Sequence, residues 1–166
     1  MKIKNRIKEL REVNAADLIP NPKNWRTHPV SQQDALKTIL SEVGYADALI
    51  ARETPDGLML IDGHLRAETT PDSKVPVLVL DVNEEEADLI LATLDPLASM
   101  AEPNTEVLKE LLDGMNYDSE NLKSLFDAVK EMNQVIDFEP GQQEDWDDYD
   151  EDISTQNECP KCNFKW

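Results

Sequence analysis

Apolar and polar positions alternate near the start of the chain, and a helical period follows. Residues 5–13 alternate well enough to predict an opening strand. The prolines in Asn21-Pro22 and His28-Pro29 then indicate an irregular loop, because each restrains the residue before it. A helix is predicted after this loop, with Ser31 and Asp34 as a capping box and Gly44 as its stop. Its apolar stripe consists of Leu36, Ile39, Leu40 and Val43.

Strands dominate the pattern between residues 48 and 82. Two short apolar runs, 48–52 and 58–61, flank a Thr-Pro-Asp-Gly turn and therefore predict a β-hairpin. A short helical segment follows, and residues 75–82 are then so rich in β-branched side chains that we expect a central strand.

Three amphipathic helices are predicted after residue 82. Asn83 is a good N-cap for the first, which should end near Leu94, before Asp95-Pro96. The apolar spacing predicts two more helices over about 104–115 and 119–133.

The C-terminal part of the chain differs in composition. Residues 137–152 contain nine acids and neither Lys nor Arg. Because this segment has few apolar groups, their burial cannot offset the entropy lost on ordering the chain. We therefore predict a flexible linker over 137–157.

The formal net charge of −19 argues against a general nucleic-acid-coating protein, whose affinity would come from Lys and Arg. One basic stretch lies within residues 1–11, where it could touch nucleic acid or form a solvated strand edge. No apolar run is long enough for a membrane span, and the two cysteines suit a reducing compartment. We therefore expect a cytoplasmic protein without membrane contact.

The most informative motif joins the second hairpin strand to a helix. The segment Ile61-Asp62-Gly63-His64-Leu65-Arg66 places a glycine and an arginine at this junction, where backbone N–H groups and a guanidinium can meet an anion. Gly63 permits a positive φ and a close approach of phosphate. The same pattern also fits a structural turn with a surface ion pair. The chain contains no Walker-type phosphate loop.

The surrounding segments resemble the ParB N-terminal domain over about residues 7–98. The resemblance is carried by residues 16–26, by the helix that ends at Gly44, by Leu60–Glu68 and by Val75-Pro76-Val77. It implies an α/β (α+β) fold of the ParB/sulfiredoxin type, with a small mixed sheet and helices. The expected organisation is a domain at 1–98, a helical extension at 99–136, the acidic linker at 137–157 and a terminal segment at 158–166.

The resemblance also implies a function. In this superfamily the Gly-x-x-Arg turn binds nucleotide phosphates: CTP in ParB proteins, ADP in free serine kinases and ATP in sulfiredoxins. Gly63 and Arg66 would then be phosphate ligands, with His64, Asn24 and Arg26 completing the site. The expected ligand is a nucleoside di- or triphosphate with Mg²⁺, and DNA is a further candidate partner.

Residues 91–98 are similar to ParB-like domains of phages and of DNA-modification methyltransferases. This similarity implies phage or mobile-element DNA metabolism, with a methyltransferase or another DNA-processing protein as partner. A homodimer is a further candidate assembly.

Two departures from the superfamily narrow these expectations. His64 and Leu65 replace the Glu and the first Arg of the ParB Gly-Glu-Arg-Arg motif, so CTP-driven clamping is in doubt. Sulfiredoxin chemistry is excluded, because His64 stands where that enzyme has its catalytic Cys.

Two other function classes remain open. Asp62, His64 and Glu68 could act as acid and base or hold a divalent metal, as in a small nuclease or kinase. Alternatively Asp62 caps the turn, His64 is exposed, and Glu68 pairs with Arg66 or is solvated. The chain could also be a non-catalytic interaction module.

The terminal cysteines form a separate candidate site. The segment Cys159-Pro160-Lys161-Cys162-Asn163 resembles one zinc knuckle, with Asn163 in the left-handed position. Zinc needs four ligands, so Cys159 and Cys162 supply half a set, and an idle pair or a redox pair are the alternatives.

Overall fold

A computed structural model describes residues 1–115, 119–135 and 157–164. The chain divides into two units, Met1–Val135 and Ile136–Trp166. Apart from Asn157, the predicted acidic linker lies outside the described residues.

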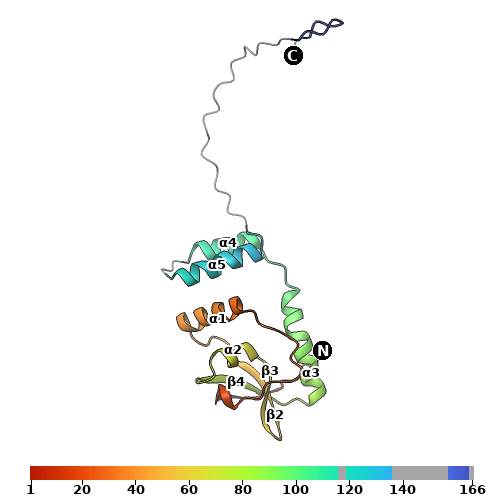
Figure 1. The fold of residues 1–166 in the computed structure, drawn as a ribbon. Helices are drawn as coiled ribbons and strands as arrows, with labels where there is room; N and C mark the ends of the chain where they lie inside the picture. The colour runs from red at the N-terminus through yellow and green to blue at the C-terminus, as the bar shows by residue number, and fades with distance from the viewer. Residues whose placement is uncertain (116–118, 136–156, 165–166) are drawn as a thin grey trace. The chain divides into compact units, whose positions relative to one another are not determined.

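A four-stranded mixed sheet is the centre of the first unit (Figure 1). Its order is β1-β4-β2-β3, so that β4 and β2 are the inner strands. Strands β2 and β3 form the predicted antiparallel hairpin, β4 runs parallel to β2, and β1 is antiparallel to β4. The bounds are Ile7–Asn14 (β1), Leu49–Thr54 (β2), Gly57–Asp62 (β3) and Lys74–Leu80 (β4).

The alternation of buried residues explains why β4 is central. Val75, Val77 and Val79 are fully buried, and the residues between them are only partly buried. They pack in one cluster with Leu49 and Leu60 of the hairpin. This cluster is the hydrophobic core, and together with the strand order it confirms the central strand and the α/β (α+β) class with a small mixed sheet that the sequence predicted.

Five α-helices and a short 3₁₀ helix accompany the sheet among the described residues. Helix α1 contacts both α2 and α5, and α3 contacts β3. Helices α4 and α5 lie side by side, joined by an ion pair between Lys130 and Asp113 at 3.3 Å (Figure 1). The bounds are Ala15–Asp17 (η1), Val30–Glu42 (α1), His64–Thr69 (α2), Glu84–Ser99 (α3), Thr105–Asp113 (α4) and Glu120–Met132 (α5).

Two predicted helix boundaries were wrong. The N-cap of α1 is Pro29, whose extended backbone ends the loop, so Ser31 lies inside the helix and forms no capping box. Helix α3 continues through Pro96 to Ser99. A proline removes one backbone bond without always ending a helix. The Ser99 hydroxyl donates to the Asp95 carbonyl at 2.9 Å, so this last turn has a side-chain bond of its own.

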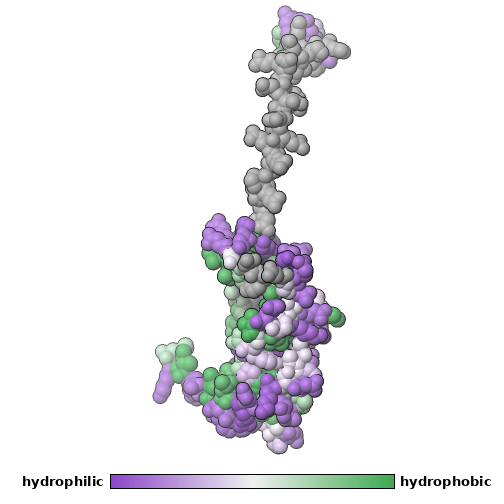
Figure 2. All heavy atoms as spheres, turned by 90° about the vertical axis from the view of Figure 1, so that its left-hand side faces the viewer, coloured by the Kyte–Doolittle hydropathy of each residue, from purple (hydrophilic) through white to green (hydrophobic). Residues whose placement is uncertain are grey.

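Three of the five basic side chains within residues 1–11 pair with carboxylates. Both terminal nitrogens of Arg6 bond to Glu86 at 2.6 Å, Lys8 bonds to Glu53, and Arg11 pairs with Glu9 and Glu53. These pairs favour the solvated strand edge over a nucleic-acid contact. Hydrophilic side chains are interspersed with hydrophobic ones on the face drawn in Figure 2. Among the described residues, no helix is both long and apolar enough to cross a membrane.

Candidate functional site

The junction between β3 and α2 is built around Gly63. This residue has φ +91°, in the left-handed region, and it is buried. A Cβ placed on it would lie 2.6 Å from Cγ of Leu49, which is too close for any side chain there. Packing against β2 therefore demands glycine, independently of any ligand.

The helix that follows contributes little electrostatic field of its own. Helix α2 has only six residues, so its dipole is weak. Its first backbone bond runs from the Ala67 N–H to the Gly63 carbonyl at 3.0 Å. The N–H groups of His64, Leu65 and Arg66 are therefore not used by the helix itself.

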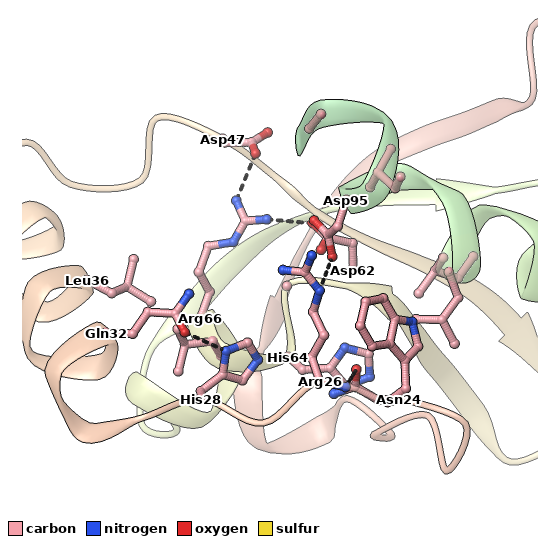
Figure 3. A pocket seen from close by; sticks show the side chains of 17 residues that line it. Asn24, Arg26, His28, Gln32, Leu36, Asp47, Asp62, His64, Arg66 and Asp95 are labelled. Carbon is pink, nitrogen blue, oxygen red and sulfur yellow. Dashed lines mark hydrogen bonds and ion pairs between the residues drawn. The ribbon is translucent and has the colours of Figure 1, made fainter. Parts of the chain in front are cut away.

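A pocket of about 510 Å³ opens at this junction (Figure 3). Five parts of the first unit meet around it: the loop after Asn21, helix α1, the segment before β2, the Gly63 junction and helix α3. Its polar lining includes Asn24, Arg26, His28, Gln32, Asp47, Asp62, Arg66 and Asp95. The structure thus brings together all five residues that the sequence proposed for phosphate binding, since Gly63 and His64 also line it.

Arg66 is held between two carboxylates. Its Nη2 donates to Asp62 at 2.8 Å and its Nη1 to Asp47 at 2.9 Å, and the side chain is only 17% exposed. The predicted cap by Asp62 is wrong, whereas the exposed Glu68 agrees with the solvated alternative rather than with an ion pair to Arg66. Gly63 is the N-cap, and no side chain caps α2.

Arg26 enters the pocket from the loop. Its Nε lies 2.8 Å from Oδ2 of Asp95 on α3, and its guanidinium lies 5.1 Å from the ring centre of Trp25. The Nε is buried, and its ion pair with Asp95 keeps Arg26 at the wall of the pocket.

His64 is buried rather than exposed, with 6% of its surface accessible. Its Nε2 accepts a hydrogen bond from the backbone N–H of Asn21 at 3.1 Å, which assigns the proton of the neutral ring to Nδ1. Burial lowers the pKa of His64 and outweighs the opposite effect of Asp62 and Glu68. The ring is therefore neutral at pH 7 and can offer a phosphate a donor but no charge.

The proposed catalytic set is divided by the structure. Asp62 and His64 line the pocket, whereas Glu68 is exposed and does not. No group of three or more His, Cys, Asp or Glu side chains within 1–115, 119–135 and 157–164 could hold a metal ion. Cys159 and Cys162 lie in the second unit.

Two carboxylates of the pocket were not identified as site residues from the sequence. Asp47 precedes β2, and Asp95 lies in the segment that resembles phage ParB-like domains. No neighbouring residues in the sequence indicated a role for either carboxylate, because the arginines that they bind lie 19 and 69 positions away.

Comparisons with known proteins identify the fold. No family model and no curated protein matches the sequence. The structure is similar to the C-terminally truncated chromosome-partitioning protein ParB from Caulobacter crescentus complexed with CTP-γ-S. That match has a TM-score of 0.53 and 19% identity, and it covers 76% of this chain and 69% of the other.

Two further matches are with a Pnob8-like ParB-N domain and with the Caulobacter crescentus ParB complexed to the centromeric parS site. Their TM-scores are 0.47 and 0.43, with 15% and 17% identity. They cover 80% and 75% of this chain, and 52% and 70% of the matched chains. The first match, with a TM-score above 0.5 at 19% identity, establishes a ParB-like fold.

Proposed function

We propose that the pocket at Gly63 binds the phosphate groups of a nucleotide, with Arg26 and Arg66 as its charged ligands. The observation that carries this proposal is that two arginines from distant parts of the sequence, Arg26 and Arg66, line one pocket beside the Gly63 junction. Guanidinium groups suit phosphate because they present several donors in a fixed plane. The N–H groups at the start of α2 and the Nδ1–H of His64 supply further donors.

The charge balance of the pocket favours a ligand that arrives with a cation. Asp47, Asp62 and Asp95 together outnumber the two arginines that they contact. A bare polyphosphate would have to compete with these carboxylates for Arg26 and Arg66. Mg²⁺ is commonly bound by one or two carboxylates together with phosphate oxygens, so Asp62 or a neighbouring carboxylate fits that role.

The choice of a nucleotide draws on the ParB structure with CTP-γ-S, whose fold this chain shares. His64 and Leu65 depart from the ParB motif at the residues that follow the glycine. The base and the number of phosphates therefore require a screen. The size of the pocket, about 510 Å³, lies in the range of small-molecule sites.

The catalytic alternative has less support. Glu68 does not line the pocket, Nε2 of His64 is engaged by Asn21, and Asp62 is bonded to Arg66. A general base needs a free acceptor within reach of its substrate, and the described geometry leaves Asp62 as the sole candidate of the three.

We place this binding activity in phage or mobile-element DNA metabolism, alongside DNA-modification enzymes. The support is the sequence similarity of residues 91–98 to the ParB-like domains of that setting. Helix α3 carries this segment along one side of the pocket. Co-purification with a DNA methyltransferase encoded in the same genome tests the setting independently of the ligand.

A calorimetric screen of nucleoside di- and triphosphates, each with and without Mg²⁺, tests the proposed ligand class. We expect at least one nucleotide to bind more tightly in the presence of Mg²⁺. Failure of every nucleotide to bind the folded protein would contradict the proposal.

Arg66→Ala then tests the site. It removes a charge-assisted bond worth roughly 1.5 to 3 kcal/mol, so affinity should fall about tenfold to a hundredfold. Arg11→Ala is the matched control, because Arg11 also pairs with carboxylates but lies on β1 and does not line this pocket. Equal affinity of the parent and the folded Arg66→Ala variant would place the ligand elsewhere.

A further inference from the structure

The terminal cysteines lie in a tight turn whose backbone is fixed by two hydrogen bonds. The Cys159 N–H donates to the Phe164 carbonyl, and the Asn163 N–H donates to the Cys159 carbonyl, both at 2.8 Å. Asn163 has φ +58°, the left-handed conformation that this turn requires and that asparagine tolerates. The predicted position of Asn163 is thus confirmed.

The turn also prepares the first sulfur for a metal. The backbone N–H groups of Lys161 and Cys162, together with the Cys162 thiol, hydrogen-bond to the Cys159 sulfur. Hydrogen bonds of this kind orient a ligating atom, so the turn fixes the position of the first sulfur. They also show that the two sulfurs lie near each other, as two ligands of one ion must.

Among the described residues, no further ligand is found beside the two cysteines. It contains two cysteines and two histidines in total. His64 is buried, with Nε2 bonded to Asn21, and Nδ1 of His28 lies 3.0 Å from Oε1 of Gln32. No cluster of three ligating side chains occurs in the part of the chain that the structure describes.

We propose that Cys159 and Cys162 from two copies of this chain bind one Zn²⁺ in a tetrahedral four-thiolate site. Structural zinc sites are almost always four-coordinate, and four thiolates are a common ligand set. Such a centre carries a charge of −2, which the exposed Lys161 of each copy would offset. The inference goes beyond the proposed function, because it adds a metal-dependent means of joining two nucleotide-binding units.

Titration of the reduced full-length protein with Zn²⁺ tests the proposal. We expect half an equivalent of tightly bound zinc per chain by metal analysis, and a shift to dimer mass in light scattering. A chelator should reverse both changes. Replacement by Co²⁺ should give the intense absorption of thiolate-to-metal charge transfer. One ion per monomer, absence of binding, or a dimer that is indifferent to zinc and chelator would each overturn the shared site.

Variants separate the metal site from the rest of the fold. Cys159→Ser and Cys162→Ser should each abolish zinc-dependent dimerisation, whereas Lys161→Ala, which keeps both thiols and the backbone N–H, should retain it. Asn163→Gly should bind zinc normally, and Asn163→Val should weaken binding by about tenfold, because valine disfavours the left-handed conformation. Nucleotide binding should be unchanged in all of them, so its loss would indicate general misfolding. Normal zinc binding by the double Cys variant would overturn the assignment.

Discussion

At the scale of single residues, Gly63 shows how a fold can require a residue that was first noticed for its chemistry. Gly63 and Gly44 both have positive φ, at +91° and +85°. A Cβ on Gly44 would meet nothing within 4 Å, whereas one on Gly63 would lie 2.6 Å from Leu49. A substitution at Gly44 therefore has only the conformational cost of a side chain, whereas one at Gly63 has the steric cost as well.

We predict that Gly44→Ala destabilises the protein by about 1 to 2 kcal/mol, the cost of a left-handed non-glycine residue. Gly63→Ala should lose roughly 1 to 3 kcal/mol more, because the added methyl overpacks the core against Leu49. Urea unfolding measures both values. Equal losses for the two variants would show that β2 moves aside and that packing does not require Gly63.

His64 supplies a second prediction at this scale, through the pH dependence of stability. Its pKa in the folded protein is lowered by burial, so between that value and about 6.5 the unfolded chain binds the proton better. Stability is therefore greatest above pH 6.5 and falls as the pH decreases through this window.

His64→Gln should flatten the dependence of the free energy of unfolding on pH in this range. His28→Gln is the control, because His28 is the one other histidine and its side-chain bond to Gln32 is exposed. Unfolding in urea at a series of pH values measures both. A slope that survives in His64→Gln but disappears in His28→Gln would contradict the assignment.

At the scale of elements, the sequence predicted correctly those strands and turns that depend on the local pattern of residues. The hairpin followed from Thr54–Gly57 between two apolar runs, and the central strand from its β-branched residues. The start of α1 and the end of α3 were misplaced, because Pro29 and Pro96 act through backbone geometry that their neighbours modify.

The residues of the candidate site also differ in whether the local sequence could reveal them. Gly63, His64 and Arg66 were found because they share one short segment. Asp95 and Asp47 were missed as partners of Arg26 and Arg66, because tertiary packing brings these pairs together from distant positions in the sequence. Burial of His64 was missed for the same reason, since its partner Asn21 lies 43 residues away.

Helix α3 provides the prediction at this scale. Asp95 holds Arg26 and adds a negative charge to the pocket, so Asp95→Asn should free the arginine and reduce repulsion of phosphate. We expect nucleotide affinity at fixed Mg²⁺ to rise roughly twofold to fivefold, the effect of an exposed ion pair. Calorimetry measures the change.

Asp88→Asn is the matched control on the same helix, because Asp88 pairs with Lys23 and does not line this pocket. Its affinity should equal that of the parent. A weaker nucleotide complex in Asp95→Asn would instead make Asp95 a ligand of the cation or a support that orients Arg26.

At the scale of the whole molecule, charge decides which partners can bind without specific recognition. Residues 136–166 carry ten acids and two lysines, a net charge of −8, which leaves −11 on residues 1–135. Within that first unit, Arg6, Arg11, Arg26 and Arg66 are each paired with a carboxylate. Because both units carry a net negative charge and these arginines are paired, we expect low sequence-independent affinity for DNA.

A chain that ends at Val135 tests this argument together with the independence of the two units. We predict that neither the full chain nor the truncated chain binds mixed-sequence duplex DNA at physiological ionic strength, as measured by fluorescence anisotropy. At low salt the truncated chain should bind more tightly than the parent, because it has lost eight net negative charges. Its nucleotide affinity and its free energy of unfolding should match those of the parent, since the core and the pocket lie within residues 1–135.

Strong, steeply salt-dependent binding of random duplex by the full chain would show that a basic surface forms despite the pairing described above. DNA would then have to be considered as a direct ligand of the fold.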